Sequence, residues 1–221
     1  MIILIVSKNN FFKSKFKKKN FFFIQDKKKL NLSNLTKIKP DIIFFPHWSW
    51  KIKQLILDRY LCIGFHATPL PYGRGGTPIQ NMILRGFSKT KLCAFKIEKK
   101  YDSGPVYFRK SVSLKGSGDE IFKRLYQNIS EMILKMSKKL PKPKKQNGKI
   151  QYFKRRKPKD SKLRINSSLT QLYDFIRMLD VSEKNFPKAY FKIGKMKYEF
   201  SNAKKIGKKI KANVVIRKLF K

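Results

Sequence analysis

Short, unbroken apolar runs that alternate with longer amphipathic segments are the feature that most constrains how this chain can fold. The runs at 2–6, 41–46 and 61–65 consist mainly of Ile, Phe, Leu and Val. Runs this short are typical of strands buried on both faces, whereas the segments at 51–60 and 119–136 repeat their apolar residues at helical spacing. This alternation predicts an α/β fold, a Rossmann-like, mostly parallel sheet with helices on both faces. Further strands are expected at 21–24, 92–97 and 106–108, and further helices at 30–38 and 78–86.

A Lys- and Pro-rich stretch at 141–148 interrupts the alternation and is interpreted as a linker. We therefore expect two domains, a larger catalytic domain at 1–149 and a small C-terminal element of α+β type at 150–221. The elements expected in the small domain are one amphipathic helix at 169–179 and a β-hairpin at 189–200 and 210–218.

The net charge of +41 comes from 54 Lys and Arg residues against 13 Asp and Glu residues. A basic surface attracts phosphates, so a nucleic acid or a nucleotide-linked substrate is one interpretation. The other is compositional drift, because 44 of the basic residues are Lys spread along the whole chain. Recognition of phosphates and bases favours the planar Arg side chain instead. Both interpretations stay open at this point.

The cysteines and the apolar runs indicate the compartment. Cys62 and Cys93 lie inside apolar runs and form neither a disulfide framework nor a metal-ligand pair. No run reaches the ~18 apolar residues that a membrane span requires, and the opening segment Met1–Val6 is too short for a signal peptide. We expect a cytoplasmic protein without a membrane span and without a metal.

Chemically distinctive residues gather where three of the predicted strands end. His47 and His66 lie in two of these loops, and Asp102 lies in the third. A single loop histidine is more often structural than catalytic. However, ligands of open α/β sheets bind beyond the carboxyl ends of the strands, so these loops together predict a functional site. The three loops are 46–50, 65–78 and 101–105.

The second loop resembles the hallmark of folate-dependent formyltransferases, which reads roughly Asn-x-His-x-Ser-x-Leu-Pro-x-x-Arg-Gly-x-x-Pro. The third loop is similar to the second motif of that family, an Asp-x-Gly turn that enters a strand. The resemblance runs from about Asp41 to Leu179 and implies transfer of a formyl group from 10-formyl-tetrahydrofolate to a primary amine. The positions in register are His66, Thr68, Leu70, Pro71, Arg74, Gly75 and Pro78, with Asp102 and Gly104 in the other motif.

By this resemblance His66 and Asp102 are the catalytic residues. His66 would stabilise the negative charge that develops on the formyl oxygen, and Asp102 would fix the histidine tautomer and accept the amine proton. The folate would contact Trp48, Trp50, Ile52 and Tyr101, and the acceptor would contact Thr68, Arg74, Gly75 and Gly76. Plainer interpretations stay open: the tryptophans as core residues, Arg74 as a brace for its loop, and Asp102 as an ordinary turn residue.

One position departs from the family pattern. The family has a catalytic Asn two residues before the histidine, and this chain has Gly64 there. In the family that Asn helps to polarise the formyl oxygen, and one such donor is worth ~10²–10³ in rate. Either another donor replaces it, with Thr68, Asn81 and His47 as candidates, or the chain is slow or inactive.

The acceptor amine is left open between two classes. The run Phe153–Ser161 resembles the segment that follows the catalytic domain of sugar-nucleotide formyltransferases, which favours a nucleotide-linked amino sugar. Methionyl-tRNA is the alternative, although the tRNA enzymes of this family carry a C-terminal domain much longer than this tail. A non-catalytic nucleic-acid-binding relative ranks third, because no aromatic-plus-Arg recognition motif is present. The oligomeric state stays open, with a homodimer among the options.

Overall fold

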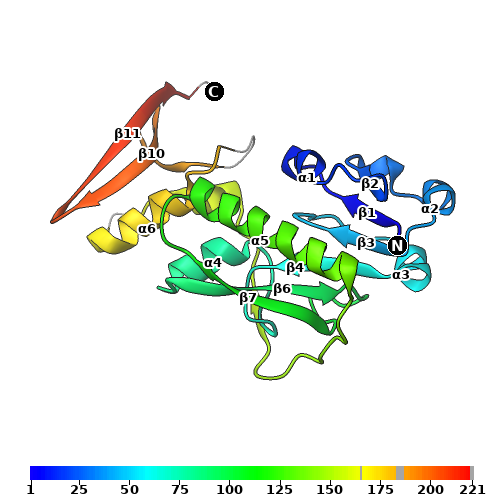
Figure 1. Ribbon diagram of the computed structural model, residues 1–221. Helices are drawn as coiled ribbons and strands as arrows, with labels where there is room; N and C mark the ends of the chain where they lie inside the picture. The colour runs from blue at the N-terminus through cyan, green and yellow to red at the C-terminus, as the bar shows by residue number, and fades with distance from the viewer. Residues whose placement is uncertain (165, 183–186, 220–221) are drawn as a thin grey trace. The chain divides into compact units, whose positions relative to one another are not determined.

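The computed structural model describes residues 1–164, 166–182 and 187–219 (Figure 1). Contacts between residues divide the chain into two compact units, each assembled from three segments. The first unit comprises Met1–Gly75, Lys91–Val112 and Arg124–Tyr152, and the second comprises Gly76–Thr90, Ser113–Lys123 and Phe153–Lys221. The domain boundary expected at 149/150 stays a prediction.

A six-stranded sheet forms the centre of the first unit, in the order β2-β1-β3-β4-β6-β7. β1 pairs in parallel with β2 and β3, and β3 pairs in parallel with β4, whereas β6 runs antiparallel to β4. The α/β fold with a mostly parallel sheet is therefore confirmed. The strands are β1 (Ile3–Val6), β2 (Phe21–Ile24), β3 (Ile42–Phe45), β4 (Cys62–His66), β6 (Lys89–Lys96) and β7 (Val106–Ser113).

The helices around this sheet include one that the sequence pattern does not predict. It is α1, and it begins after Asn9, whose side chain accepts a hydrogen bond from the backbone N–H of Phe11. Its Phe12 is fully buried. The helices and the 3₁₀ helix of this part are α1 (Asn10–Lys15), η1 (Lys27–Lys29), α2 (Leu32–Ile38), α3 (Gln54–Arg59) and α5 (Gly118–Lys138), which begins in the second unit.

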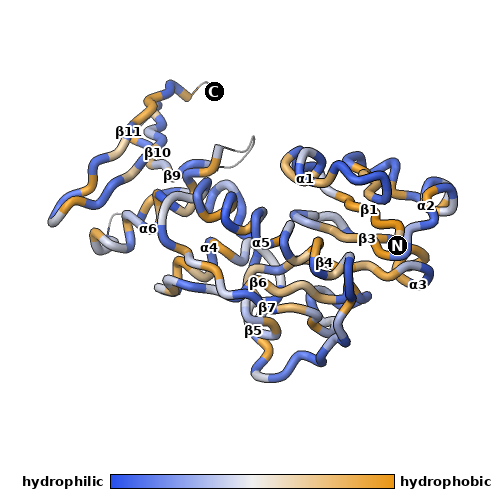
Figure 2. Tube along the Cα trace, in the orientation of Figure 1, coloured by the Kyte–Doolittle hydropathy of each residue, from blue (hydrophilic) through white to orange (hydrophobic). Residues whose placement is uncertain are grey.

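Both faces of the sheet are covered. Leu4 of β1 packs in one core cluster with Leu35 of α2 and Ile56 of α3. Its neighbours along the strand, Ile3 and Ile5, point to the opposite face because successive strand residues alternate. Both are also 0% exposed. Figure 2 shows the hydrophobic residues concentrated along β1 and β3.

A small two-stranded sheet follows β4 in the chain. It consists of β5 (Tyr72–Gly75) and β8 (Gln151–Phe153). The sequence pattern predicts only a loop at β5.

The stretch at 141–148, interpreted as a linker, instead pairs with β7. The Val106 N–H donates to the Lys144 carbonyl at 2.7 Å, and the Lys144 N–H donates to the Val106 carbonyl at 2.9 Å.

The second unit contains a three-stranded antiparallel sheet, in the order β11-β10-β9, where the sequence pattern predicts a hairpin. The strand expected at 189–200 is broken by a turn at Gly194, and a second turn lies at Gly207. Both glycines have φ near +50°, a conformation that disfavours other residues. The elements are α4 (Pro78–Leu84), η2 (Pro158–Ser161), α6 (Leu169–Leu179), β9 (Ala189–Ile193), β10 (Met196–Ile206) and β11 (Lys209–Lys218). Within the described ranges, no helix is both long and apolar enough to cross a bilayer.

Candidate active site

His66 is the last residue of β4 and is 7% exposed. Its Nε2 lies 2.8 Å from the carbonyl oxygen of Gly73 in β5. Because a carbonyl oxygen only accepts hydrogen bonds, Nε2 must carry the hydrogen. The main chain of β5 therefore fixes the orientation of the ring.

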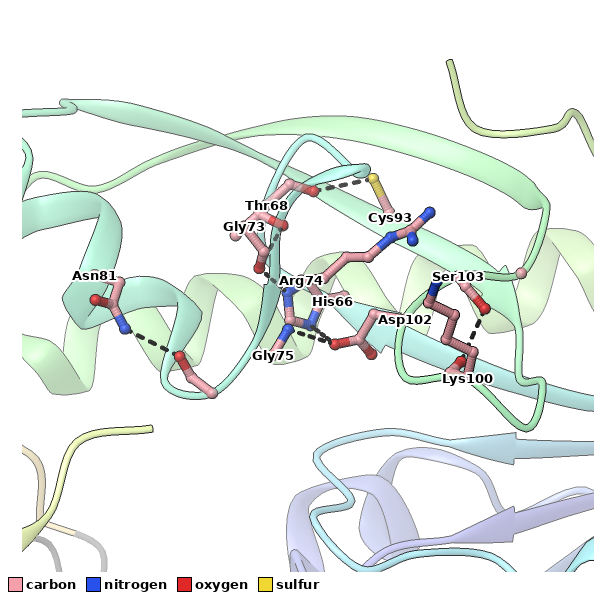
Figure 3. Close-up of polar contacts among 12 residues, drawn as sticks. His66, Thr68, Gly73, Arg74, Gly75, Asn81, Cys93, Lys100, Asp102 and Ser103 are labelled. Carbon is pink, nitrogen blue, oxygen red and sulfur yellow. Dashed lines mark hydrogen bonds and ion pairs between the residues drawn. The ribbon is translucent and has the colours of Figure 1, made fainter. Parts of the chain in front are cut away.

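Asp102 lies in the loop between β6 and β7 and reaches the same place from a distant part of the sequence (Figure 3). Its Oδ2 accepts a 2.8 Å hydrogen bond from the Gly75 N–H and lies 3.6 Å from Nδ1 of His66. Its backbone has φ +51°, a left-handed conformation that few residues other than glycine adopt. The structure thus brings the two expected catalytic side chains together.

Both ring nitrogens of His66 face oxygen atoms. One ring nitrogen faces a carbonyl oxygen and the other faces a carboxylate oxygen. Among the residues that the structure describes, the second carboxylate oxygen of Asp102, Oδ1, has no hydrogen-bond partner. That oxygen remains able to accept a hydrogen bond.

Thr68 and Arg74, expected to contact the acceptor, are engaged in holding the loop. The Thr68 hydroxyl donates to the Gly73 carbonyl at 3.3 Å, and the Thr68 carbonyl accepts from the Cys93 thiol at 3.2 Å. Burial raises the pKa of that thiol, so it stays protonated and able to donate. Arg74 is 5% exposed and donates from Nε and Nη2 to the Gln146 side-chain oxygen, at 3.1 and 2.7 Å. These contacts match the interpretation of Arg74 as a brace.

The two glycines expected near the acceptor have backbone roles. Gly75 provides the N–H that Asp102 accepts. Gly76 is the first residue of the second unit, where its N–H donates to the Phe153 carbonyl at 2.9 Å. A Cβ on Gly76 would lie 2.4 Å from Cα of Arg155, so only glycine allows that approach.

The four residues expected at the folate differ in exposure. Trp48 and Trp50 pack edge to face, with ring centroids 4.7 Å apart. The Trp48 indole N–H is buried and has no partner in the described part of the chain. Ile52 is 6% exposed and belongs to the core, so only its backbone remains for a ligand. Tyr101 is 66% exposed.

Comparison with known proteins decides the family. A family model described as "Methionyl-tRNA formyltransferase, C-terminal domain" matches residues 158–217. The solved structure of methionyl-tRNA formyltransferase from Clostridium thermocellum is 39% identical to this chain, with a TM-score of 0.91 and 98% of each chain covered. The chain belongs to the formyltransferase family. The family model also corrects an expectation, because the tail that looked too short matches a C-terminal domain of the tRNA enzymes.

Two further relatives set the limits of the comparison. The methionyl-tRNA formyltransferase of Sulfurihydrogenibium sp. (strain YO3AOP1) is 28% identical over 182 residues, covering 78% of this chain and 57% of that protein. The chain therefore spans about half the length of the curated relatives it matches. The formyltransferase PseJ from Anoxybacillus kamchatkensis, in complex with UDP-4,6-dideoxy-4-formamido-L-AltNAc and tetrahydrofolate, is 18% identical, with a TM-score of 0.57 and coverage of 69% and 84%. At that identity it shares the fold alone.

Gly64 is the position at which this chain departs from the family pattern, and the structure shows what fills the space. A Cβ at position 64 would lie 3.0 Å from the Phe95 ring and 3.1 Å from Ile97. The three candidate replacement donors already have partners. Thr68 bonds Gly73, His47 bonds the Tyr126 hydroxyl at 2.7 Å, and the Asn81 amide bonds backbone oxygens within the second unit.

Gln146 is the site residue that sequence reasoning misses. It lies in the stretch at 141–148, where Lys and Pro dominate and no period is visible. Its side chain contacts Arg74, Asp102 and Gly104. The available signal is weak: two adjacent uncharged amides, Gln146 and Asn147, within a strongly basic run. Across the described ranges, no three His, Cys, Asp or Glu side chains gather in a metal-binding arrangement.

Proposed function

We propose that this chain transfers a formyl group from 10-formyl-tetrahydrofolate to the primary amine of methionyl-tRNA, with His66 and Asp102 as the catalytic residues. The observation that carries the chemistry is the pair formed by the buried His66 and the half-buried Asp102, with Nδ1 of His66 3.6 Å from Oδ2 of Asp102 at the end of β4. The choice of methionyl-tRNA as the acceptor rests on the 39% identity, over 98% of both chains, with the Clostridium thermocellum methionyl-tRNA formyltransferase.

The two residues divide the chemistry between them. When bound, 10-formyl-tetrahydrofolate supplies the formyl carbon and the nitrogen from which that carbon departs. His66 stabilises the charge that develops on the formyl oxygen, by donating its Nε2 hydrogen there in place of the Gly73 carbonyl. Asp102 keeps Nδ1 of the ring facing a negative charge. Its Oδ1 accepts the proton that leaves the amine and passes it to the nitrogen from which the formyl carbon departs, so that Asp102 ends ionised again.

The residues expected at the folate fit a flat heteroaromatic ring. The buried Trp48 N–H is a donor without a partner in the described structure, and buried donors normally have one. A bound ring with an acceptor atom would satisfy it. We assign ring contacts to Trp48 and Trp50, a backbone contact to Ile52, and an outer contact to the exposed Tyr101.

A nucleotide-linked amino sugar is the competing acceptor. Its support is the sequence run Phe153–Ser161 and the fold shared with PseJ, and at 18% identity that second likeness does not extend to the substrate. The net charge of +41 suits an RNA acceptor better than a small one, because RNA presents many phosphates to one surface. We therefore favour methionyl-tRNA.

The test offers both acceptors to the same protein. Purified chain is incubated with 10-formyl-tetrahydrofolate and either methionyl initiator tRNA or a panel of nucleotide-linked amino sugars, and the products are identified by mass. We expect formylmethionyl-tRNA, loss of turnover in His66→Ala, and retained turnover in Asp58→Asn, which changes an exposed carboxylate on α3. Formylated sugar without formylated tRNA would move the proposal to the competing acceptor. No product from either, with folate bound, would favour a non-catalytic relative.

A further inference from the structure

The Gln146 side-chain amide is saturated with hydrogen bonds that join two parts of the site. Its Oε1 accepts from Nε and Nη2 of Arg74, at 3.1 and 2.7 Å. Its Nε2 donates to the carbonyl oxygens of Asp102 and Gly104, both at 2.8 Å. Two acceptor positions and two donor hydrogens are thus all used.

Among side chains, only an amide offers both the acceptor oxygen and the two donor hydrogens that this position uses. Arg74 can only donate, and the two carbonyls can only accept, so the group between them must accept on one side and donate on the other. The same constraint fixes which way the amide points, because the flipped orientation would face like groups on both sides. A Glu would satisfy Arg74 but would turn an oxygen toward both carbonyls.

The turn that Gln146 holds is the one that presents the Asp102 carboxylate. Asp102 has φ +51°, so its conformation depends on outside contacts. On another side the turn lies against β6, where a Cβ on Gly104 would come within 1.9 Å of the Lys96 carbonyl oxygen. The amide donates to the carbonyl oxygens of the residues before and after Ser103. These two bonds therefore set the direction in which the Asp102 side chain projects from the turn.

We propose that Gln146 is a positioning residue of this enzyme: its amide, oriented by Arg74, holds the Asp102–Gly104 turn so that the carboxylate faces His66. The proposal rests on the proposed function, because it acts through Asp102. It also gives Arg74 a defined purpose. The guanidinium is nearly buried, and its bonds to Gln146 connect the loop after His66 with the loop that carries Asp102.

The first experiment measures kcat and KM for wild type, Gln146→Ala and Gln146→Glu, with the adjacent, exposed Asn147→Ala as the control. Misplacing a catalytic group by about 1 Å costs up to ~10²-fold. We expect kcat to fall about 10- to 100-fold in both Gln146 variants, KM to change less than about twofold, and Asn147→Ala to match wild type. The loss in Gln146→Glu should be at least as large as in Gln146→Ala, although Glu keeps the partner of Arg74.

A double variant separates positioning from general support of the fold. If Gln146 acts through Asp102, adding Gln146→Ala to Asp102→Ala should change kcat by less than about twofold. The same 10- to 100-fold loss in that background would overturn the proposal. So would wild-type kcat in Gln146→Glu, because that variant lacks both donors to the turn.

A spectroscopic measurement keeps the proposal testable without turnover. The chain has two histidines, so His47→Gln assigns the ring resonances of His66 by NMR. We expect Gln146→Ala to move the His66 resonances toward their positions in Asp102→Ala. An inactive wild type with this shift would count against the proposed function and not against the placement of Asp102 by Gln146. Unmoved His66 resonances in both Gln146 variants would overturn the placement itself.

Discussion

The site loops of the first unit and the β9–β11 sheet of the second use polar residues in opposite ways. Around His66 the polar groups are buried and held by named partners: Thr68 is 0% exposed and Arg74 is 5% exposed. In the sheet, Lys209 and Lys211 are exposed, and Ile216 of the same strand is 58% exposed. The function of the first region depends on the position of each atom. The second region can contribute to function only through its total charge and its shape. Substitutions should therefore have large effects in the first and small ones in the second.

Asp102→Asn should show the largest effect. Asn still offers an oxygen to the Gly75 N–H, so the loop is kept, but it removes the negative charge that lies 3.6 Å from Nδ1 of His66. Positioned proton acceptors contribute about 10²–10⁴-fold, and we expect kcat to fall at least about 10²-fold with the melting temperature within about 2 °C of wild type. Single-turnover rates and thermal melts check this. A loss below threefold would make Asp102 an ordinary turn residue.

Replacing one glycine by alanine in each region gives the second comparison. In Gly104→Ala the new methyl would lie 1.9 Å from the Lys96 carbonyl oxygen, so the backbone must move. We expect a loss of about 3 kcal/mol in the free energy of unfolding. Gly194→Ala meets nothing within 4 Å, and its φ of +52° alone costs about 1 kcal/mol. Denaturant unfolding measures both. Equal losses of unfolding free energy would mean that the backbone of the turn at Gly104 adjusts to a methyl group as easily as the exposed turn between β9 and β10.

The elements that could be predicted from the sequence are those whose signal is local. The buried strands at β1, β3 and β4 and the long helix α5 follow directly from apolar runs and helical period. His66 and Asp102 could be named from their motifs because the family spacing is unusual, although the motifs do not give the distance between the two side chains. That distance depends on how the fold places the end of β4 relative to the β6–β7 loop.

The elements that could not be predicted have signals that are weak or non-local. Phe12 of α1 and Phe16, which caps its C-terminal end, lie one turn apart, but the Lys and Asn residues around them hide the spacing. β5 exists because its chain segment pairs with β8, about 75 residues later in the sequence. Gln146 joins the site only because Arg74 and the Asp102 turn contact it, and neither lies near it in sequence.

Restoring the family Asn at position 64 tests how the first region tolerates change. Gly64 lies in a strand with an ordinary backbone, so the obstacle is the Phe95 ring 3.0 Å from the new Cβ. We expect Gly64→Asn alone to lose about 1–2 kcal/mol of stability. The double variant Gly64→Asn with Phe95→Leu should recover stability. Its kcat should be about tenfold higher than that of Phe95→Leu alone, because the Asn adds a donor near the reacting oxygen. Equal kcat values would mean that another group already supplies that donor.

A single lysine of β11 should show the smallest effect. Lys211 is exposed, and at 0.15 M ionic strength charges are screened over about 8 Å. Lys211→Gln should therefore weaken the binding of methionyl-tRNA less than about threefold. It should also lower the slope of log Kd against log salt by about 1 or less. Filter binding at several salt concentrations measures both quantities, and Lys211→Arg, which keeps the charge, is the control. A tenfold loss in Lys211→Gln with wild-type binding in Lys211→Arg would identify a fixed ionic contact. The sheet would then resemble the site loops, where individual groups matter, and the contrast between the two regions would not hold.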